Sequence, residues 1–138
     1  MSSALLPEET CFISEFLVSN RRERIAWELA RADRRADCIW RFAHCARELL
    51  IPARIHSVLV QKGKFMLEGI DFMQKIGNPQ ILLLSPFADR DRTKMGFQDA
   101  IDCNLGGGPY IAIDCGLQFA FIETESGCEG HEFLFLRR

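Results

Sequence analysis

The segment 85–92, with the sequence SPFADRDR, holds two arginines together with hydroxyl and carboxylate side chains. It follows a strongly apolar run, and the pattern after it predicts a helix that begins near Asp89. The first N–H groups of a helix favour an anion, and arginine binds phosphate or carboxylate through paired hydrogen bonds. These residues are therefore candidates for an anion site in which Arg90 and Arg92 clamp the ligand, assisted by Ser85 and Asp89. The favoured interpretation is that Asp89 caps the helix and the charges face solvent.

A glycine-rich turn lies further along the chain, where Gly106, Gly107 and Gly108 precede a proline. Consecutive backbone N–H groups in such a turn can bind an oxyanion or a phosphate. The turn lacks the lysine and hydroxyl residues of a P-loop and the spacing of a dinucleotide-binding fingerprint. The favoured interpretation is therefore a helix C-cap followed by a tight turn that needs glycine for a positive φ.

Cysteine chemistry is a third candidate, because Cys115 follows Asp114 at the end of a predicted strand. The thiol can act as a nucleophile if His56 or His131 folds close to it as a base, and Asp114 is an alternative reactive group. No local sequence signature of a catalytic cysteine accompanies these residues. Free cysteines are commonly buried, so core packing is the favoured interpretation.

One cysteine and one histidine have a spacing that zinc ligands use. They are Cys128 and His131, and the nearest further cysteines, Cys103 and Cys115, lie well before them and far from each other. Strong zinc-binding sequences instead pair two closely spaced couples of ligands. We therefore predict no bound metal and no cofactor.

Arginines are concentrated in the segment 21–35. Acidic residues are interleaved with them at the spacing of helical neighbours, as for Arg24 and Glu28. The whole chain carries a net charge of -2, whereas a dedicated nucleic-acid-binding domain usually has a strong basic excess. We expect a solvated, self-paired face and no nucleic-acid partner.

The chain has 138 residues, of which 48% are hydrophobic and 26% charged, which suits one domain spanning 1–138 with a buried core. This balance excludes a disordered chain, and no apolar run reaches the length of a membrane-spanning helix. The first residues show neither the basic nor the apolar region of a signal peptide. The six cysteines are therefore expected to be mostly reduced, in a cytoplasmic protein.

Two helical segments are expected in the N-terminal part. Pro7 opens the first, two glutamates follow it, and apolar residues recur at helical spacing to Leu17. Asn20 and Glu23 have the spacing of a capping box, so a second helix should run from there to Leu50. Apolar residues three and four apart form a seam along this helix, which includes Ile25, Leu29, Ala32, Ala36, Ile39 and Ala43.

An unbroken second helix would be about 45 Å long, which exceeds the size of a domain of this length. Either the helix breaks near residues 31–35, or its seam packs against a second copy of the chain. The alanines of the seam allow another helix to approach closely. We therefore predict the seam as the interface of a homodimer or of a complex with another protein.

Strand-like runs follow at 55–60, 81–84, 110–114, 117–124 and 131–136. Residues 65–76 fit a short helix best, although 58–60 and 65–67 can instead pair as a hairpin. A further helix is expected from Asp89 to Leu105. The predicted fold is therefore α+β: a long N-terminal helical layer packed on a mixed sheet of about five strands that ends in an antiparallel meander.

The candidate residues do not converge on a catalytic set, so we expect a non-enzymatic interaction module of the binding or inhibitor type. It would act in the cytoplasm through protein–protein contacts and associate with itself through the seam. The alternative is a small enzyme or ligand-binding domain for a phosphate- or carboxylate-bearing substrate. That alternative requires Arg90, Gly107 and Cys115 to line one pocket.

Overall fold

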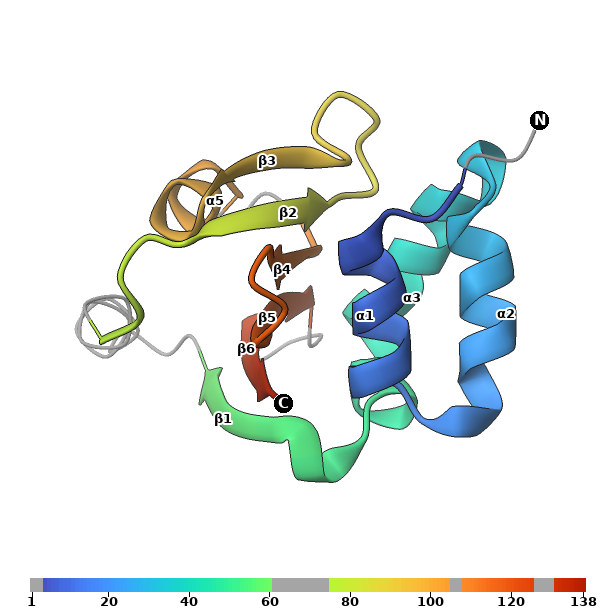
Figure 1. Cartoon of the computed structure of the whole chain (residues 1–138), viewed down its shortest axis with the longest axis horizontal. Helices are drawn as coiled ribbons and strands as arrows, with labels where there is room; N and C mark the ends of the chain where they lie inside the picture. The colour runs from blue at the N-terminus through green and yellow to red at the C-terminus, as the bar shows by residue number, and fades with distance from the viewer. Residues whose placement is uncertain (1–3, 61–74, 105–107, 126–130) are drawn as a thin grey trace.

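The computed structural model describes residues 4–60, 75–104, 108–125 and 131–138. Its elements form three layers, with helices α1–α3 on one face of a sheet and the short helix α5 on the other (Figure 1). The α+β class is confirmed. The sheet differs from the prediction in two ways, because all pairings are antiparallel and six strands are present among the described residues. None of the helices in these ranges has both the length and the apolar character needed to cross a bilayer.

The first helix, α1 (Pro7–Phe16), begins where the sequence predicts. Pro7 occupies its first turn, and the Glu9 carboxylate accepts a hydrogen bond of 2.8 Å from the Leu6 backbone N–H. Proline and acidic side chains both stabilise the start of a helix. Phe12 and Phe16 are buried on its inner side, so the predicted apolar stripe faces the core.

The predicted long helix is two helices, α2 (Ser19–Leu29) and α3 (Ala32–Leu49), so the alternative with a break is correct. The chain leaves the helical path at Arg31, whose backbone is extended. The predicted cap at Asn20 is wrong, because Val18 is the N-cap residue and no side chain caps the helix. Two helices of ordinary length fit within the domain, so the length of the segment requires no second copy.

A backbone clasp joins the end of α1 to the end of α3. Val18 N–H donates to the Leu49 carbonyl, and Ile51 N–H donates to the Phe16 carbonyl, at 2.9 and 2.8 Å. The chain then forms one 3-10 turn, η1 (Pro52–Arg54), and enters the sheet. The clasp therefore places the start of the sheet beside the C-terminal end of α1.

The sheet has the strand order β1-β6-β5-β4-β2-β3, and β4, β5 and β6 form the predicted meander. The strands are β1 (Ile55–Val60), β2 (Gln80–Leu84), β3 (Thr93–Gly96), β4 (Tyr110–Asp114), β5 (Phe119–Glu125) and β6 (His131–Arg137). Both faces of β2 are buried, since Leu82 packs with the N-terminal helices and Leu83 with α5. The apolar character of the run 81–84 is thus explained by a strand that is buried on both faces.

The helix expected from Asp89 is wrong in its first half. Residues 93–96 form β3 against β2, and α5 (Phe97–Asn104) begins only after them. Arg92 has a φ of 62°, and its N–H donates to the Leu83 carbonyl at 2.7 Å, so the chain turns back along β2. Of the predicted segment 65–76, residues 65–74 lie outside the described residues.

Candidate functional site

The predicted anion clamp in 85–92 does not form. The loop leads into a strand, so the helix expected to begin at Asp89 is not formed there. Arg90 is exposed and stacks over the Phe87 ring at 5.7 Å, and Asp89 is exposed. The Ser85 hydroxyl accepts a hydrogen bond from Phe87 N–H, which shapes the turn. Ser85 and Asp89 therefore do not join the two arginines around one space.

Arg92 instead belongs to the buried ion cluster, which we define as Glu9, Arg35, Asp91 and Arg92. The fully buried Glu9 carboxylate contacts Arg35 (Nη1–Oε2, 2.7 Å) and Arg92 (Nη2–Oε1, 2.8 Å). Arg35 also donates two hydrogen bonds to Asp91, at 2.7 and 3.0 Å. Charges are tolerated in a protein interior when they are paired and hydrogen-bonded. The cluster joins α1, α3 and the loop before β3, which is a structural role.

The described end of the glycine turn lies beside the loop 85–92, whereas the thiol lies at the opposite end of β4. Gly106 and Gly107 are outside the described residues, and Gly108 has a φ of 107°. A Cβ at Gly108 would lie 3.1 Å from the Phe87 ring, so this glycine serves a tight turn. Cys115 N–H bonds to Gln80 at the start of β2, whereas Arg90 follows the end of that strand. The pocket required by the enzyme hypothesis is therefore not formed by Arg90 and Cys115.

Cys115 has no nearby histidine base on the neighbouring strands. His56 is on β1, which β6 and β5 separate from β4, a distance of about 14 Å across the sheet. Burial raises the pKa of Cys115, and the Glu8 carboxylate raises it further. Asp114 accepts hydrogen bonds from the Gly116 and Gln118 N–H groups, so its carboxylate holds the turn after β4.

No group of metal-ligating side chains gathers within the part of the chain that the structure describes. Cys128 lies outside that part, and His131 begins β6. The prediction of no metal is therefore untested at this pair.

The predicted interface seam is largely internal. Ile25, Leu29 and Ile39 are buried in the core that α1–α3 share with the sheet, with exposures of 1%, 0% and 0%. These three side chains are already covered, so they cannot form the predicted contact with a second copy. Ala32 is exposed and Ala36 half-buried, and Ala43 lies within α3.

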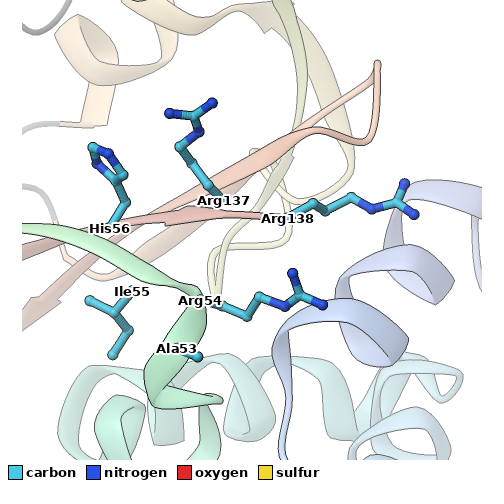
Figure 2. A pocket seen from close by; sticks show the side chains of 6 residues that line it. All are labelled: Ala53, Arg54, Ile55, His56, Arg137 and Arg138. Atoms are coloured by element: carbon cyan, nitrogen blue, oxygen red, sulfur yellow. The ribbon is translucent and has the colours of Figure 1, made fainter.

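A pocket that the sequence did not reveal lies where β1 begins and β6 ends (Figure 2). We call it the basic pocket. Its volume is about 390 Å³, and it is lined by Ala53, Arg54, Ile55, His56, Arg137 and Arg138. The clasp between α1 and α3 delivers Arg54 to this position, and the antiparallel pairing of β1 with β6 brings the two arginines at the C-terminal end beside it.

A β-bulge shapes one side of the basic pocket. The register of β1 against β6 shifts by one residue between Ile55 and Ser57, so His56 is an extra residue. Bulges redirect side chains and are frequent near functional sites. The His56 ring meets the Phe135 ring edge-on at 5.8 Å. In Figure 2 the His56 and Arg137 side chains extend to the same side of the two strands.

The opposite side of the basic pocket faces α1. The Arg54 and Arg138 side chains extend toward that helix (Figure 2) and share the Glu15 carboxylate, at 3.7 and 3.2 Å. Arg137 is exposed and forms no ion pair with a described residue. Two guanidinium groups therefore share one carboxylate and the third extends to the other side of the strands, so the residues lining the pocket carry an excess of positive charge.

Sequence reasoning missed the three arginines of the pocket and considered His56 only as a base for Cys115. No local signal marks these residues, because Arg54 and Arg138 belong to opposite ends of the sheet-forming sequence and meet through strand pairing. No protein-family model matches the chain, and comparisons with curated proteins and with solved structures gave no significant match. The geometry of the pocket is therefore the basis for a function.

Proposed function

We propose that the protein binds a small phosphate- or carboxylate-bearing ligand in the basic pocket. The observation that carries the proposal is the excess of cations there: Arg54, Arg137 and Arg138 line the pocket, and among the described residues only Glu15 pairs with any of them, through Arg54 and Arg138. Guanidinium forks match phosphate and carboxylate oxygens in pairs, which favours these anions over a halide. The sequence alone suggests an anionic ligand as the alternative function. We keep that ligand class but place it where β1 begins and β6 ends, instead of in the loop 85–92.

The dimensions and the walls of the basic pocket support a small ligand. Its volume of about 390 Å³ is in the range of small-molecule sites. Ala53 and Ile55 add apolar surface beside the arginines, which suits a ligand with a short carbon skeleton attached to the anion. Asp114 and Cys115 lie at the end of β4 and are not among the residues that line the pocket, so the proposal is for binding without catalysis.

Calorimetric titration with inorganic phosphate and with citrate tests the proposal. Arg137→Gln should weaken the binding of the better anion about tenfold, the size of one lost charge-assisted hydrogen bond. Arg90→Gln is the matched control, because it removes the same charge from an exposed arginine outside the pocket, in the loop that follows β2. Equal affinities in wild type and Arg137→Gln would contradict the basic pocket. Loss of binding in Arg90→Gln alone would restore the loop site.

A second candidate function is the protein-binding module expected from the sequence. The observation that favours it is an exposed tryptophan, Trp27, among arginines on α2 and α3. Such a surface fits contact with another protein better than the seam does, because aromatic and arginine side chains are enriched in protein interfaces. Native mass spectrometry distinguishes binding of another protein from self-association. A mass equal to one chain would contradict the predicted homodimer.

We also propose a reducing, cytoplasmic location. Cys11, Cys38, Cys45, Cys103 and Cys115 are all free thiols. Unpaired cysteines are typical of reducing compartments. Labelling of thiols in freshly lysed cells before and after reduction would test this, and a disulfide present before reduction would contradict it.

A further inference from the structure

Trp27 stands out on the helical layer because 39% of its surface is exposed. Three guanidinium groups surround its ring: Arg24, Arg31 and Arg34, with their central carbons 5.1, 4.0 and 5.9 Å from the ring centroid. We call these four residues the Trp27 face. Cations over an indole ring are attracted by its π electrons, so the four side chains form one surface.

The break between α2 and α3 builds this surface. Because the chain turns at Arg31, side chains from the end of one helix and the start of the next meet over the same ring. Arg31 Nη1 also donates a 2.7 Å hydrogen bond to the Trp27 carbonyl, which fixes its guanidinium over the indole. A surface whose side chains are already ordered loses less conformational entropy when a partner binds.

The positive charge of the Trp27 face is largely uncompensated within the described residues. Arg31 and Arg34 form no ion pair with a described residue. Arg24 reaches Glu28 at 3.4 Å but keeps 65% of its side chain exposed. Glu28 itself is buried and bound by both terminal nitrogens of Arg41, at 2.8 and 2.7 Å. The carboxylate that Arg24 contacts is thus already engaged by another arginine.

We propose that the Trp27 face is a docking site for an acidic segment of a partner protein. Carboxylates of the segment would pair with Arg24, Arg31 and Arg34, and a neighbouring apolar side chain would cover the exposed part of Trp27. Charge complementarity and an aromatic centre are the features that proteins use in such contacts. The surface lies on α2 and α3, so the inference is independent of the anionic ligand in the basic pocket.

A nucleic acid fits the same face less well. A base would need a free face of the indole, but Arg31 stacks 4.0 Å from the ring centroid. Exposed acidic side chains on the same two helices, Glu23 and Asp33, would repel a continuous phosphate backbone, and the chain as a whole is acidic. A short peptide can place its carboxylates at the three arginines and avoid these acidic residues.

Fluorescence anisotropy of a labelled peptide rich in aspartate and leucine tests the inference, at an ionic strength of about 0.15 M. The peptide should bind, and the same peptide with asparagine in place of aspartate should not. Arg34→Gln and Trp27→Ala should each weaken binding about tenfold, the effect of losing an interface anchor. Lys75→Gln is the matched control. It removes one exposed positive charge from the segment before β2, on the side of the molecule opposite α2 (Figure 1).

Three outcomes would overturn the inference. The first is unchanged affinity in both Arg34→Gln and Trp27→Ala while their circular dichroism spectra match wild type. The second is equal binding of the aspartate and asparagine peptides. The third is single-stranded DNA that binds more tightly than the peptide and loses its affinity in Trp27→Ala, which would assign the face to nucleic acid. Loss of phosphate binding in the Arg137→Gln variant tests the other site and leaves this result unaffected.

Discussion

Two arginine clusters in this chain place the same type of side chain in different surroundings. In the buried ion cluster two arginines, Arg35 and Arg92, meet two carboxylates at distances down to 2.7 Å, and Glu9 and Arg35 at its centre are buried. In the basic pocket Arg54 and Arg138 share only Glu15, at 3.2 Å or more, while Arg137 forms no ion pair with a described residue, and solvent reaches all three. The difference shows that the ratio of charges and their burial decide whether arginine holds a fold together or remains available to a ligand.

The largest effect is expected from the carboxylate of the buried ion cluster. Glu9→Gln leaves Arg35 and Arg92 without their shared negative charge in a buried setting. Removing one partner of a buried ion pair costs about 3–5 kcal/mol of stability. Urea unfolding should show this loss as a lower midpoint with an unchanged slope. A loss below about 1 kcal/mol would indicate that the cluster behaves like an exposed surface pair, and the contrast between the two regions would fail.

A pair of intermediate exposure should give an intermediate, pH-dependent effect. Hydrogen bonds from Arg41 hold the pKa of the buried Glu28 below its usual range, although burial opposes this. A lowered pKa in the folded state stabilises the protein above the unfolded-state pKa of a glutamate, about 4.3. That contribution is lost as the pH falls through the lower pKa of the folded protein. The pair should therefore contribute to the free energy of unfolding at neutral pH and make no contribution in strong acid.

The measurement for this pair is the difference in unfolding free energy between wild type and Glu28→Gln across an acid titration. The difference should be largest near neutral pH and should shrink in acid. Glu48→Gln, at an exposed glutamate of α3, serves as the control. A Glu28→Gln difference that stays constant throughout the titration would show that Arg41 does not lower this pKa.

The smallest change in stability is expected from the carboxylate of the basic pocket, where the effect on binding has the opposite sign. Glu15→Gln removes a partly exposed partner of Arg54 and Arg138, so stability should change by no more than about 1 kcal/mol. The freed arginines should bind inorganic phosphate several-fold more tightly in the calorimetric titration, because the competing negative charge is gone. Weaker binding in Glu15→Gln would show that this carboxylate positions the arginines for the ligand.

Local patterns predicted the elements better than they predicted the sites. Pro7 with its following glutamates marked the start of α1, and the apolar run 81–84 marked a strand buried on both faces. The short strand β3 escaped prediction because its cause is not local. Arg92 adopts a positive φ, which non-glycine residues rarely do, and then pairs the chain with β2.

The two arginine clusters were beyond sequence reasoning for the same reason. Arg92 meets Glu9 across 83 positions of the chain, and the basic pocket joins residues before β1 with residues at the end of β6. Spacing along a sequence shows which side chains share a face of one element. It does not show which elements meet, so the sequence suggests a ligand for Arg92, whereas its partner in the structure is Glu9 of α1.

The bulge at His56 also affects the outer border of the sheet. Among the described strands, β1 and β3 are the outermost. β3 has only four residues. The regular pairing of β1 is interrupted by the bulge near the start of the strand. Edge-to-edge aggregation needs a long, regular row of unpaired backbone groups. Neither border offers one, so we expect the chain to resist amyloid-like growth and to meet other proteins through side chains.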